Sequence, residues 1–261
     1  MHVLLLTDFS VNAKKMQDYA INFFADSPAH FTLLHSKKPN SNRDKDPNYK
    51  NCNTHQELEK ELLILKSKIK PNQTASKVFI NQNLVDSVRM FIKNSSTDMI
   101  FMGGKGRTSD SSRQFGKNTF DIVKKVRCPI MVIFKNSRIK IPSRVAFPLD
   151  NTNQIQDKYL TTLRKLSFWT SIKLSILEVP NNMLKSDLLK NFNEKTFSKA
   201  FSDLEFRLEK PHMNNNKVCY NCIKADMIMF MAKNLNISNQ IFDQLDTETT
   251  DRQTPLLVLH A

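Results

Sequence analysis

The chain has 261 residues, which is the length of one large domain or of two ordinary ones. Its 40% hydrophobic and 25% charged residues lie within the globular range and exclude wholesale disorder. The longest apolar runs, residues 130–134 and 256–259, fall far short of the ~18–20 residues of a membrane span, and residues 3–6 are too few for a signal-peptide core. Four cysteines do not indicate a disulfide framework, so we expect a soluble, cytoplasmic protein with no membrane partner.

The first half of the chain alternates short apolar runs with amphipathic segments. Continuous apolarity is typical of strands that are buried on both faces of a parallel sheet. Such runs predict strands at residues 3–6, 31–34, 78–80, 99–102 and 130–134. Helical spacing of apolar residues predicts a helix that begins after Ser10, then helices at 57–69, 84–92 and 120–126, with a polar loop at 39–53.

The second half repeats this plan. It predicts strands at residues 145–149, 172–179, 204–208 and 256–259, and helices at 154–166, 182–201 and, as a short one, 217–224. Three short blocks also recur in the same order, beginning at residues 3 and 145, 98 and 226, and 128 and 254. Their collinearity indicates two copies of one unit.

Alternating strands and helices predict an α/β fold with right-handed crossovers. We expect two tandem open, mostly parallel five-stranded sheets flanked by helices, in domains at residues 1–137 and 143–261 joined by a linker at 135–143. Each last strand would otherwise leave an apolar edge exposed. The two copies should therefore pair within one chain through residues 129–134 and 255–260, and further association into a homodimer is possible.

Glycine is scarce and confined to one window. Average usage of ~7% would give roughly 18 glycines in a chain of this length, but there are 4, all within residues 103–116. Three of them have the spacing Gly-x-x-Gly-x9-Gly, and the window follows a predicted strand and precedes a predicted helix. Glycine permits positive φ and close approach of the backbone to a ligand, and a helix N-terminus attracts anions. The pattern predicts a phosphate-binding loop; it is neither a Walker A loop nor a Rossmann fingerprint.

The net charge of +14 is concentrated around this window, because residues 101–140 carry ten Lys and Arg against two Asp and Glu. Lys105, Arg107 and Lys117 would supply positive charge to a bound anion. A basic surface also suggests nucleic acid. However, residues 103–119 contain only one aromatic residue, Phe115, and no DNA-binding motif is evident, so we expect no specific nucleic-acid partner.

The first half resembles the universal stress protein family, and the second half does so less clearly. The resemblance lies in four motifs: Leu6-Thr7-Asp8-Phe9-Ser10, Leu33-Leu34-His35, Met102-Gly103 with the glycine loop, and Cys128-Pro129. The resemblance implies that the loop holds the phosphates of ATP or another adenine nucleotide, which can bind together with Mg. It also implies that Asp8 contacts the nucleoside and that the backbone of Ser36 contacts adenine. The expected binding residues are Thr7, Asp8, Ser36, Met102, Gly103, Gly106, Arg107, Gly116, Lys117 and Asn118.

Position 117 departs from the family pattern, in which a small hydroxyl residue is usual. Lys117 would either neutralise phosphate as a point charge or obstruct the site. The resemblance implies a stress-response regulator with no catalytic residues and at most weak ATP hydrolysis, acting with unknown protein partners. Two alternatives remain: a protein-interaction module without nucleotide, and an enzyme of the related adenine-nucleotide α-hydrolase type, whose Ser-Gly-Gly loop is absent after the first strand.

The second copy and the cysteines offer weaker candidates. The second copy keeps Asp150 but has residues 231–234 in place of the glycines, followed by an acidic loop at 234–252, so we expect a degenerate site. Cys219 and Cys222 invite a redox or zinc interpretation with His212 nearby. Because zinc prefers four ligands, we expect instead that the two cysteines pack in the core on one face of a helix, and we expect no structural metal.

Overall fold

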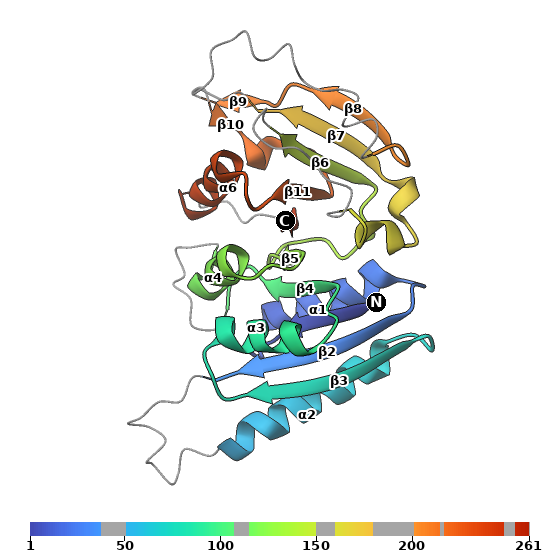
Figure 1. Cartoon of the computed structure of the whole chain (residues 1–261), viewed down its shortest axis with the longest axis vertical. Coiled ribbons are helices and arrows are strands. Elements are labelled where there is room, and N and C mark those ends of the chain that lie inside the picture. Colours follow the sequence, from blue (N-terminus) through green and yellow to red (C-terminus); the bar gives the residue numbers. More distant parts are fainter. Residues whose placement is uncertain are drawn as a thin grey trace.

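The computed structural model describes residues 1–37, 51–106, 115–149, 160–179, 201–214, 217–247 and 254–260. Its centre is one ten-stranded sheet with the strand order β3-β2-β1-β4-β5-β12-β11-β6-β7-β8, and helices lie on both of its faces (Figure 1). The α/β class and the mostly parallel pairing agree with the expectation from the sequence. The expectation of two separate five-stranded sheets is wrong, because the two halves share one continuous sheet.

The first half supplies five strands and four helices, close to the predicted positions. The strands are β1 (His2–Leu6), β2 (Ala29–Ser36), β3 (Gln73–Ile80), β4 (Met99–Gly103) and β5 (Ile130–Ile133). The helices are α1 (Val11–Phe24), α2 (Asn51–Lys68), α3 (Leu84–Asn94) and α4 (Lys117–Lys125). The polar loop predicted at 39–53 is wrong at its end, since α2 already begins at Asn51.

The second half supplies strands β6 (Arg144–Leu149), β7 (Lys173–Glu178), β8 (Glu205–Glu209), β11 (Met227–Met231) and β12 (Leu256–Leu259), and helix α6 (Leu235–Thr247). A separate two-stranded ladder, β9 (Met213–Asn214) with β10 (Lys217–Val218), lies beyond β8 in the chain. The short segments η2 (Leu163–Lys165), η3 (Trp169–Ser171) and η5 (Tyr220–Cys222) are 3-10 turns.

Two helices predicted for the second half are wrong where the structure describes them. Residues 160–166, the end of the helix predicted at 154–166, form turns and the 3-10 segment η2. The segment 217–224 contains β10 and the turn η5 instead of a helix. Residues 180–200, which include nearly all of the helix predicted at 182–201, lie outside the described residues.

The two halves join through their last strands. Leu256, Leu257 and Val258 of β12 pair antiparallel with Val132, Met131 and Ile130 of β5, and every other pairing in this sheet is parallel. All eight residues of β5 and β12 are buried. The expected pairing of the last strands is confirmed, and it places apolar edges of both halves in the interior of the sheet.

Equivalent hydrogen bonds recur on the two sides of this junction. The amide of His2 donates to Asp98 Oδ2 at 2.8 Å, and the amide of Asp98 donates to the carbonyl of His2 at 2.9 Å. In the second half, the amide of Arg144 donates to Asp226 Oδ2 at 3.0 Å and the amide of Asp226 returns to the carbonyl of Arg144 at 2.8 Å. The offsets, 142 and 128 residues, are those of the first two sequence repeats.

Apolar side chains fill two layers, one on each face of the sheet. One layer contains Met16 of α1 and Leu62 of α2, together with Trp169 of the second half. The other contains Val88 of α3 and, from the helices after the fourth strand of each half, Ile122 of α4 and Ile237 of α6. Both layers continue across the β5–β12 junction.

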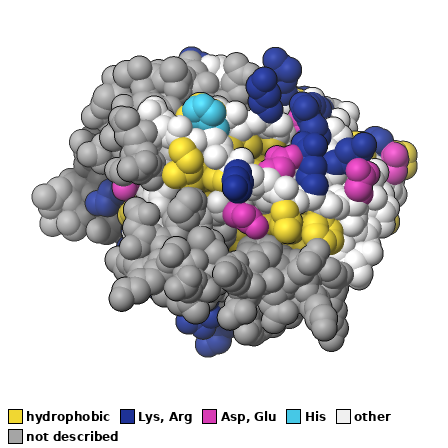
Figure 2. Space-filling model, turned by 90° about the horizontal axis from the view of Figure 1, so that it is seen from above, with side chains coloured by type: hydrophobic (Ala, Val, Ile, Leu, Met, Phe, Trp, Pro, Cys, Tyr) yellow, Lys and Arg dark blue, Asp and Glu magenta, His cyan; other side chains and the backbone are white. Residues whose placement is uncertain are grey.

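Surface charge and helix length bear on possible membrane and nucleic-acid partners. Seen from the β8 end, basic and acidic side chains are interspersed rather than gathered into one basic face (Figure 2). Within the described ranges, no helix combines the length and the apolarity that crossing a membrane requires.

Candidate functional site

The candidate site lies at the carboxyl ends of β1 and β4, which are neighbours in the sheet. The chain leaves β1 toward β2 on one side, whereas β4 and β5 lie on the other side, so the strand order reverses here. Open α/β sheets bind ligands at such a switch point, just beyond the carboxyl ends of the strands. Asp8 follows β1, and the glycine window begins with Gly103 at the end of β4.

The two ends of the glycine window are held together by the backbone. The amide of Gly104 donates to the carbonyl of Ile133 at 2.8 Å, and the amide of Gly116 donates to the carbonyl of Gly104 at 2.7 Å. The hydroxyl of Thr119 donates to the carbonyl of Gly103 at 2.9 Å. Residues 107–114, and Arg107 with them, lie outside the described residues.

The glycines permit close packing rather than unusual torsion angles. None of the four has a positive φ, so that part of the expectation is wrong. A Cβ at Gly103 would lie 2.6 Å from Asn12 Nδ2, and a Cβ at Gly104 would lie 2.6 Å from the ring of Phe134. A Cβ at Gly106 would lie 2.7 Å from Asp8 Oδ2, which brings the carboxylate after β1 against the backbone of the loop after β4.

The N-terminus of α4 is the second part of the site. Gly116 is its N-cap residue and offers no side chain to the first-turn amides. Lys117 and Asn118 are exposed in that first turn, whereas Thr119 is buried. Amides at a helix N-terminus carry partial positive charge and can donate to an anion. The predicted residues of α4 thus stand where they can meet phosphate.

The segment after β1 is braced by side chains. The hydroxyl of Thr7 donates to the Glu61 carboxylate at 2.9 Å and accepts from the amide of Phe9 at 3.1 Å. Asp8 Oδ1 accepts from the amide of Ser10 at 3.1 Å. Phe9 has a φ of 63°, a left-handed conformation that costs a non-glycine residue of order 1–3 kcal/mol. The side chain of Thr7, predicted to bind ligand, is therefore used to hold this strained turn.

Glu61 is a buried carboxyl that the sequence analysis did not single out. It is 4% exposed on α2 and also accepts a hydrogen bond from Gln17 of α1. Burial raises the pKa of Glu61 more than the hydrogen bonds from Gln17 and Thr7 lower it. The cluster links α1 and α2 to the end of β1.

Ser36 ends β2 two residues beyond the last pairing with β1. The carbonyl of Leu34 accepts from the amide of Thr7 at 3.0 Å, whereas the amide of Lys37 donates to Ile80 of β3 at 3.1 Å. Because backbone groups alternate between the two sides of a strand, those of Ser36 point the same way as those of Leu34, toward the space beyond β1. That these groups contact adenine stays a prediction from the family resemblance.

Aromatic rings border the same space. His35 Nδ1 donates to the carbonyl of Thr7 at 2.8 Å, and the ring of Phe9 lies 4.5 Å from the ring of His35. The ring of Phe79 of β3 stacks on the ring of His35, with the ring centroids 6.0 Å apart. These rings provide apolar surface for a flat base beside the polar end of β1.

Asn12 of α1 is a site residue that the sequence analysis missed. Its Nδ2 donates to the carbonyl of Lys105 at 3.1 Å and to that of Ile133 at 3.4 Å, which anchors the first turn of the glycine window. Its position two residues after the Ser10 N-cap gives no sequence signal, because the contact spans 93 residues. Met102 is buried in β4 and reaches the site through its backbone alone.

The corresponding place in the second half is built differently. After β11, α6 begins at Leu235, only four residues beyond the strand, and Asn234 Oδ1 caps it by accepting from the amide of Ile237 at 3.1 Å. The acidic loop predicted at 234–252 is therefore wrong, since residues 235–247 are helical. Asp150 lies outside the described residues.

The expectation for the cysteine pair is wrong. Cys219 and Cys222 are joined by a disulfide, on a 3-10 turn rather than an α-helix. Cys219 is half-buried and Cys222 is exposed, so neither is a core residue. Cys128, by contrast, is buried, and burial raises its pKa to about 12.

Comparison with known proteins bears on the family and on the fold. The family model of the Universal stress protein family matches residues 1–133. A universal stress protein from Archaeoglobus fulgidus is 16% identical with a TM-score of 0.70, covering 98% of this chain and 95% of its own. A protein described as a universal stress protein from Pseudomonas aeruginosa is 12% identical with a TM-score of 0.57, covering 99% and 92%.

The same architecture occurs in another setting. The cytoplasmic domain of a prokaryotic cation chloride cotransporter is 11% identical with a TM-score of 0.58, covering 99% of this chain and 95% of its own. At such identities the likeness concerns the fold alone. No protein of curated function matches the sequence.

Proposed function

Because the chain belongs to the universal stress protein family, we propose that its first half binds an adenine nucleotide, with ATP the leading candidate, and that the protein is a nucleotide-dependent regulator rather than a dedicated catalyst. One observation carries this proposal. Asp8 after β1 and Gly106 after β4 meet at the switch point of the sheet, where a Cβ at position 106 would lie only 2.7 Å from Asp8 Oδ2.

The residues present fit a nucleotide in three places. Backbone amides around Gly103 and Gly106 and at the N-terminus of α4 would bind phosphate oxygens, with Lys117 adding positive charge. Asp8 would accept hydrogen bonds from the ribose, and the backbone of Ser36 would contact the adenine edge. A magnesium ion would neutralise further phosphate charge without requiring a protein ligand of its own.

The other predicted residues take indirect roles in this proposal. Thr7 would act as a positioning residue, because its hydroxyl is bonded to Glu61 and to the amide of Phe9. Met102 would contribute only backbone. Arg107 remains a predicted phosphate contact that lies outside the described residues.

We further propose one site per chain. The strand order of residues 143–261 mirrors that of residues 1–137, and equivalent hydrogen bonds recur in both, which supports a second copy of the family's unit. In that copy α6 starts directly after β11 with Asn234 as its cap, so the first-turn amides already have a side-chain partner. A phosphate-binding loop has no equivalent there among the described residues.

Calorimetric titration with ATP and AMP tests this proposal. Gly106→Val should abolish binding while leaving the fold intact, since its Cβ meets the end of the Asp8 side chain rather than backbone. Asp150→Ala is the matched control and should bind as the wild type does. Two sites per chain, or loss of binding in Asp150→Ala, would contradict the one-site proposal. Wild-type protein that binds neither nucleotide would favour a protein-interaction module instead.

A further inference from the structure

The second half carries a cluster of metal-binding side chains far from the nucleotide site in the chain. The imidazole of His212 and the sulfurs of Cys219 and Cys222 all lie within 4.8 Å of one another. None of the three is buried in the core, because His212 and Cys222 are exposed and Cys219 is half-buried. We propose that these residues form a redox-gated zinc site, which binds Zn²⁺ when the Cys219–Cys222 disulfide is reduced and loses it when the disulfide forms.

The backbone brings the three ligands together before any metal binds. Met213 pairs with Val218 in the β9–β10 ladder, so His212 and Cys219 stand opposite each other at its end. The amide of Cys219 donates to the carbonyl of His212 at 2.8 Å. The 3-10 turn then returns Cys222 toward Cys219, with the amide of Cys222 donating to the carbonyl of Cys219 at 3.1 Å.

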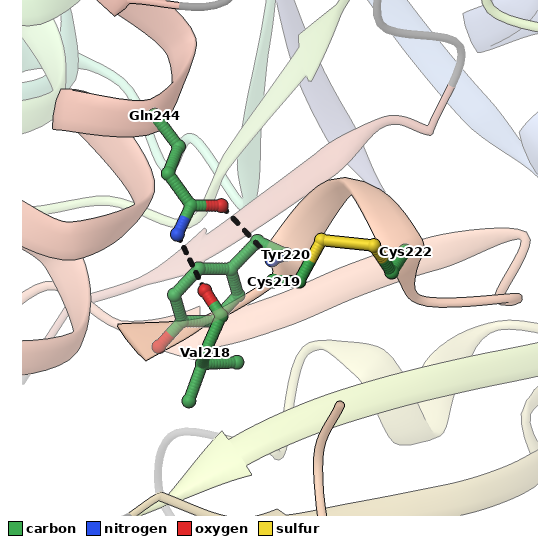
Figure 3. The surroundings of a disulfide bond; sticks show 5 residues. All are labelled: Val218, Cys219, Tyr220, Cys222 and Gln244. Atoms are coloured by element: carbon green, nitrogen blue, oxygen red, sulfur yellow. Dashed lines mark hydrogen bonds between the residues drawn. A yellow bond between two sulfur atoms is a disulfide. The ribbon is translucent and has the colours of Figure 1, made fainter. Parts of the chain in front are cut away.

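Helix α6 holds this turn in place through one side chain. Gln244 of α6 accepts from the amide of Tyr220 at 2.9 Å and donates to the carbonyl of Val218, so one side chain brackets Cys219 on both sides (Figure 3). Val218 and Tyr220 are each 1% exposed and belong to the apolar layer that contains α6. The residues next to the cysteines are therefore anchored inward, whereas Cys219 is half-buried and Cys222 is exposed. Such an anchored base limits the rearrangement that binding needs.

The ligand set fits zinc. Thiolates at Cys-x2-Cys spacing with one histidine are typical zinc ligands, and in tetrahedral geometry their ligand atoms lie about 3.5–3.8 Å apart. Once the sulfurs are no longer bonded they would move apart, and a ring nitrogen of His212, within 4.8 Å of them, would move closer by at most about 1.3 Å. Three protein ligands leave the fourth position for water or an exogenous ligand. This proposal replaces the expectation of a protein without structural metal.

The site opens to zinc by thiol–disulfide exchange and closes by oxidation of the two thiolates. Two small-molecule thiols reduce the Cys219–Cys222 disulfide by exchange, becoming a disulfide themselves and leaving two protein thiols. Binding of Zn²⁺ displaces the two thiol protons to water, and His212 binds through a neutral ring nitrogen. In reverse, a peroxide takes two electrons from the two thiolates and, with two protons, becomes two waters, while the sulfurs bond and Zn²⁺ is released.

The test uses the full chain in its reduced and oxidised forms, with metal removed by a chelator. Co²⁺ serves as the probe, because absorption from thiolate-to-cobalt charge transfer reports sulfur coordination directly, and Zn²⁺ should abolish the signal by displacement. Reduced wild-type protein should bind one Co²⁺ per chain and the disulfide form none. Cys222→Ser should lose the charge-transfer signal. Loss of a residue that only hydrogen-bonds a metal ligand lowers affinity by about 10–100-fold, and His212→Ala, which removes a ligand, should lower Co²⁺ affinity by at least as much.

Cys128→Ser is the matched control, because this buried cysteine lies away from the cluster and should leave cobalt binding unchanged. Thermal unfolding of each variant confirms that the chain remains folded. Peroxide added to the zinc-loaded protein should release one Zn²⁺ per chain and form one disulfide, detected by mass spectrometry of the Cys219–Cys222 peptide. Reduced wild type that binds no more Co²⁺ than Cys222→Ser would overturn the site. Equal binding by the disulfide form, or zinc retained after peroxide, would overturn the gate.

Discussion

Asp226 offers the clearest test of what holds the start of β6 against the start of β11 in the second half. Its carboxylate is 5% exposed and accepts hydrogen bonds from Lys140 Nζ at 2.5 Å, from the amide and hydroxyl of Ser143 at 3.0 and 2.9 Å, and from the amide of Arg144 at 3.0 Å. Lys140 and Ser143 belong to the connection between β5 and β6 and Arg144 begins β6, whereas Asp226 immediately precedes β11. Replacing Asp226 with Asn keeps the size of the side chain but removes its charge and one acceptor.

The size of the expected change in unfolding free energy follows from the pKa of Asp226. Burial raises the pKa of Asp226, but the hydrogen bonds from Lys140, Ser143 and Arg144 outweigh burial and lower it from 3.8 to about 2. This depression corresponds to about 2 kcal/mol of unfolding free energy at neutral pH. This contribution is complete above the unfolded pKa and is lost as the pH falls toward 2, with about 1 kcal/mol of it lost between pH 5 and pH 3. Asp226→Asn should therefore lower the unfolding free energy by about 2 kcal/mol at pH 7 and by less at pH 3.

Urea unfolding of the wild type and the variant at pH 7, 5 and 3 measures this difference. Asp98→Asn is the matched control, because Asp98 holds the equivalent place in the first half but is 23% exposed at its side chain and has an exposed lysine as its partner. Asp98→Asn should lower the unfolding free energy by less than Asp226→Asn does. A difference between wild type and Asp226→Asn that does not change with pH, or that equals the effect of Asp98→Asn, would refute the reasoning.

Three further predictions concern the candidate site. Gly104→Ala should lower the unfolding free energy by about 1–3 kcal/mol, because its Cβ would meet the buried ring of Phe134. Gly116→Ser has no neighbour closer than 3.6 Å to its Cβ and should raise the unfolding free energy by about 0.3 kcal/mol as a better helix cap. Equal effects of the two substitutions in urea unfolding would contradict this. Thr7→Val should cost about 1–3 kcal/mol in the same assay because Glu61 loses a buried donor, and an unchanged midpoint would show that the bond is not structural. Lys117→Ser should change the calorimetric affinity for ATP more than that for AMP, and equal changes would place Lys117 away from the terminal phosphates.

The sequence predicted the strands of the first half because each contains a continuous apolar run, whereas β11 was not predicted as a strand. All five strands of the first half, and the pairing of β5 with β12, follow from runs such as residues 99–102 and 130–134 and from the need to cover their edges. The prediction of two sheets was wrong for the same physical reason, since covering both edges with each other makes one sheet.

The errors lie where local spacing does not decide the structure. Residues 217–224 have cysteines three positions apart, as a helix would, yet the chain forms a ladder and a turn because Gln244, distant in the sequence, binds the backbone around Cys219. In the candidate site, the glycine window and Asp8 were predicted from the sequence. The bond from Thr7 to Glu61 and the anchoring of the loop by Asn12 were not, because they join residues 54 and 93 positions apart that carry no motif.

Native mass spectrometry of the full chain with excess ATP tests the central claim most directly, because it counts bound nucleotides on each molecule. Wild-type protein should gain the mass of a single ATP per chain, and Gly106→Val should remain bare under the same conditions. A second ATP on the wild-type chain, or an equal adduct on Gly106→Val, would contradict a single nucleotide site built from Asp8 and the glycine loop.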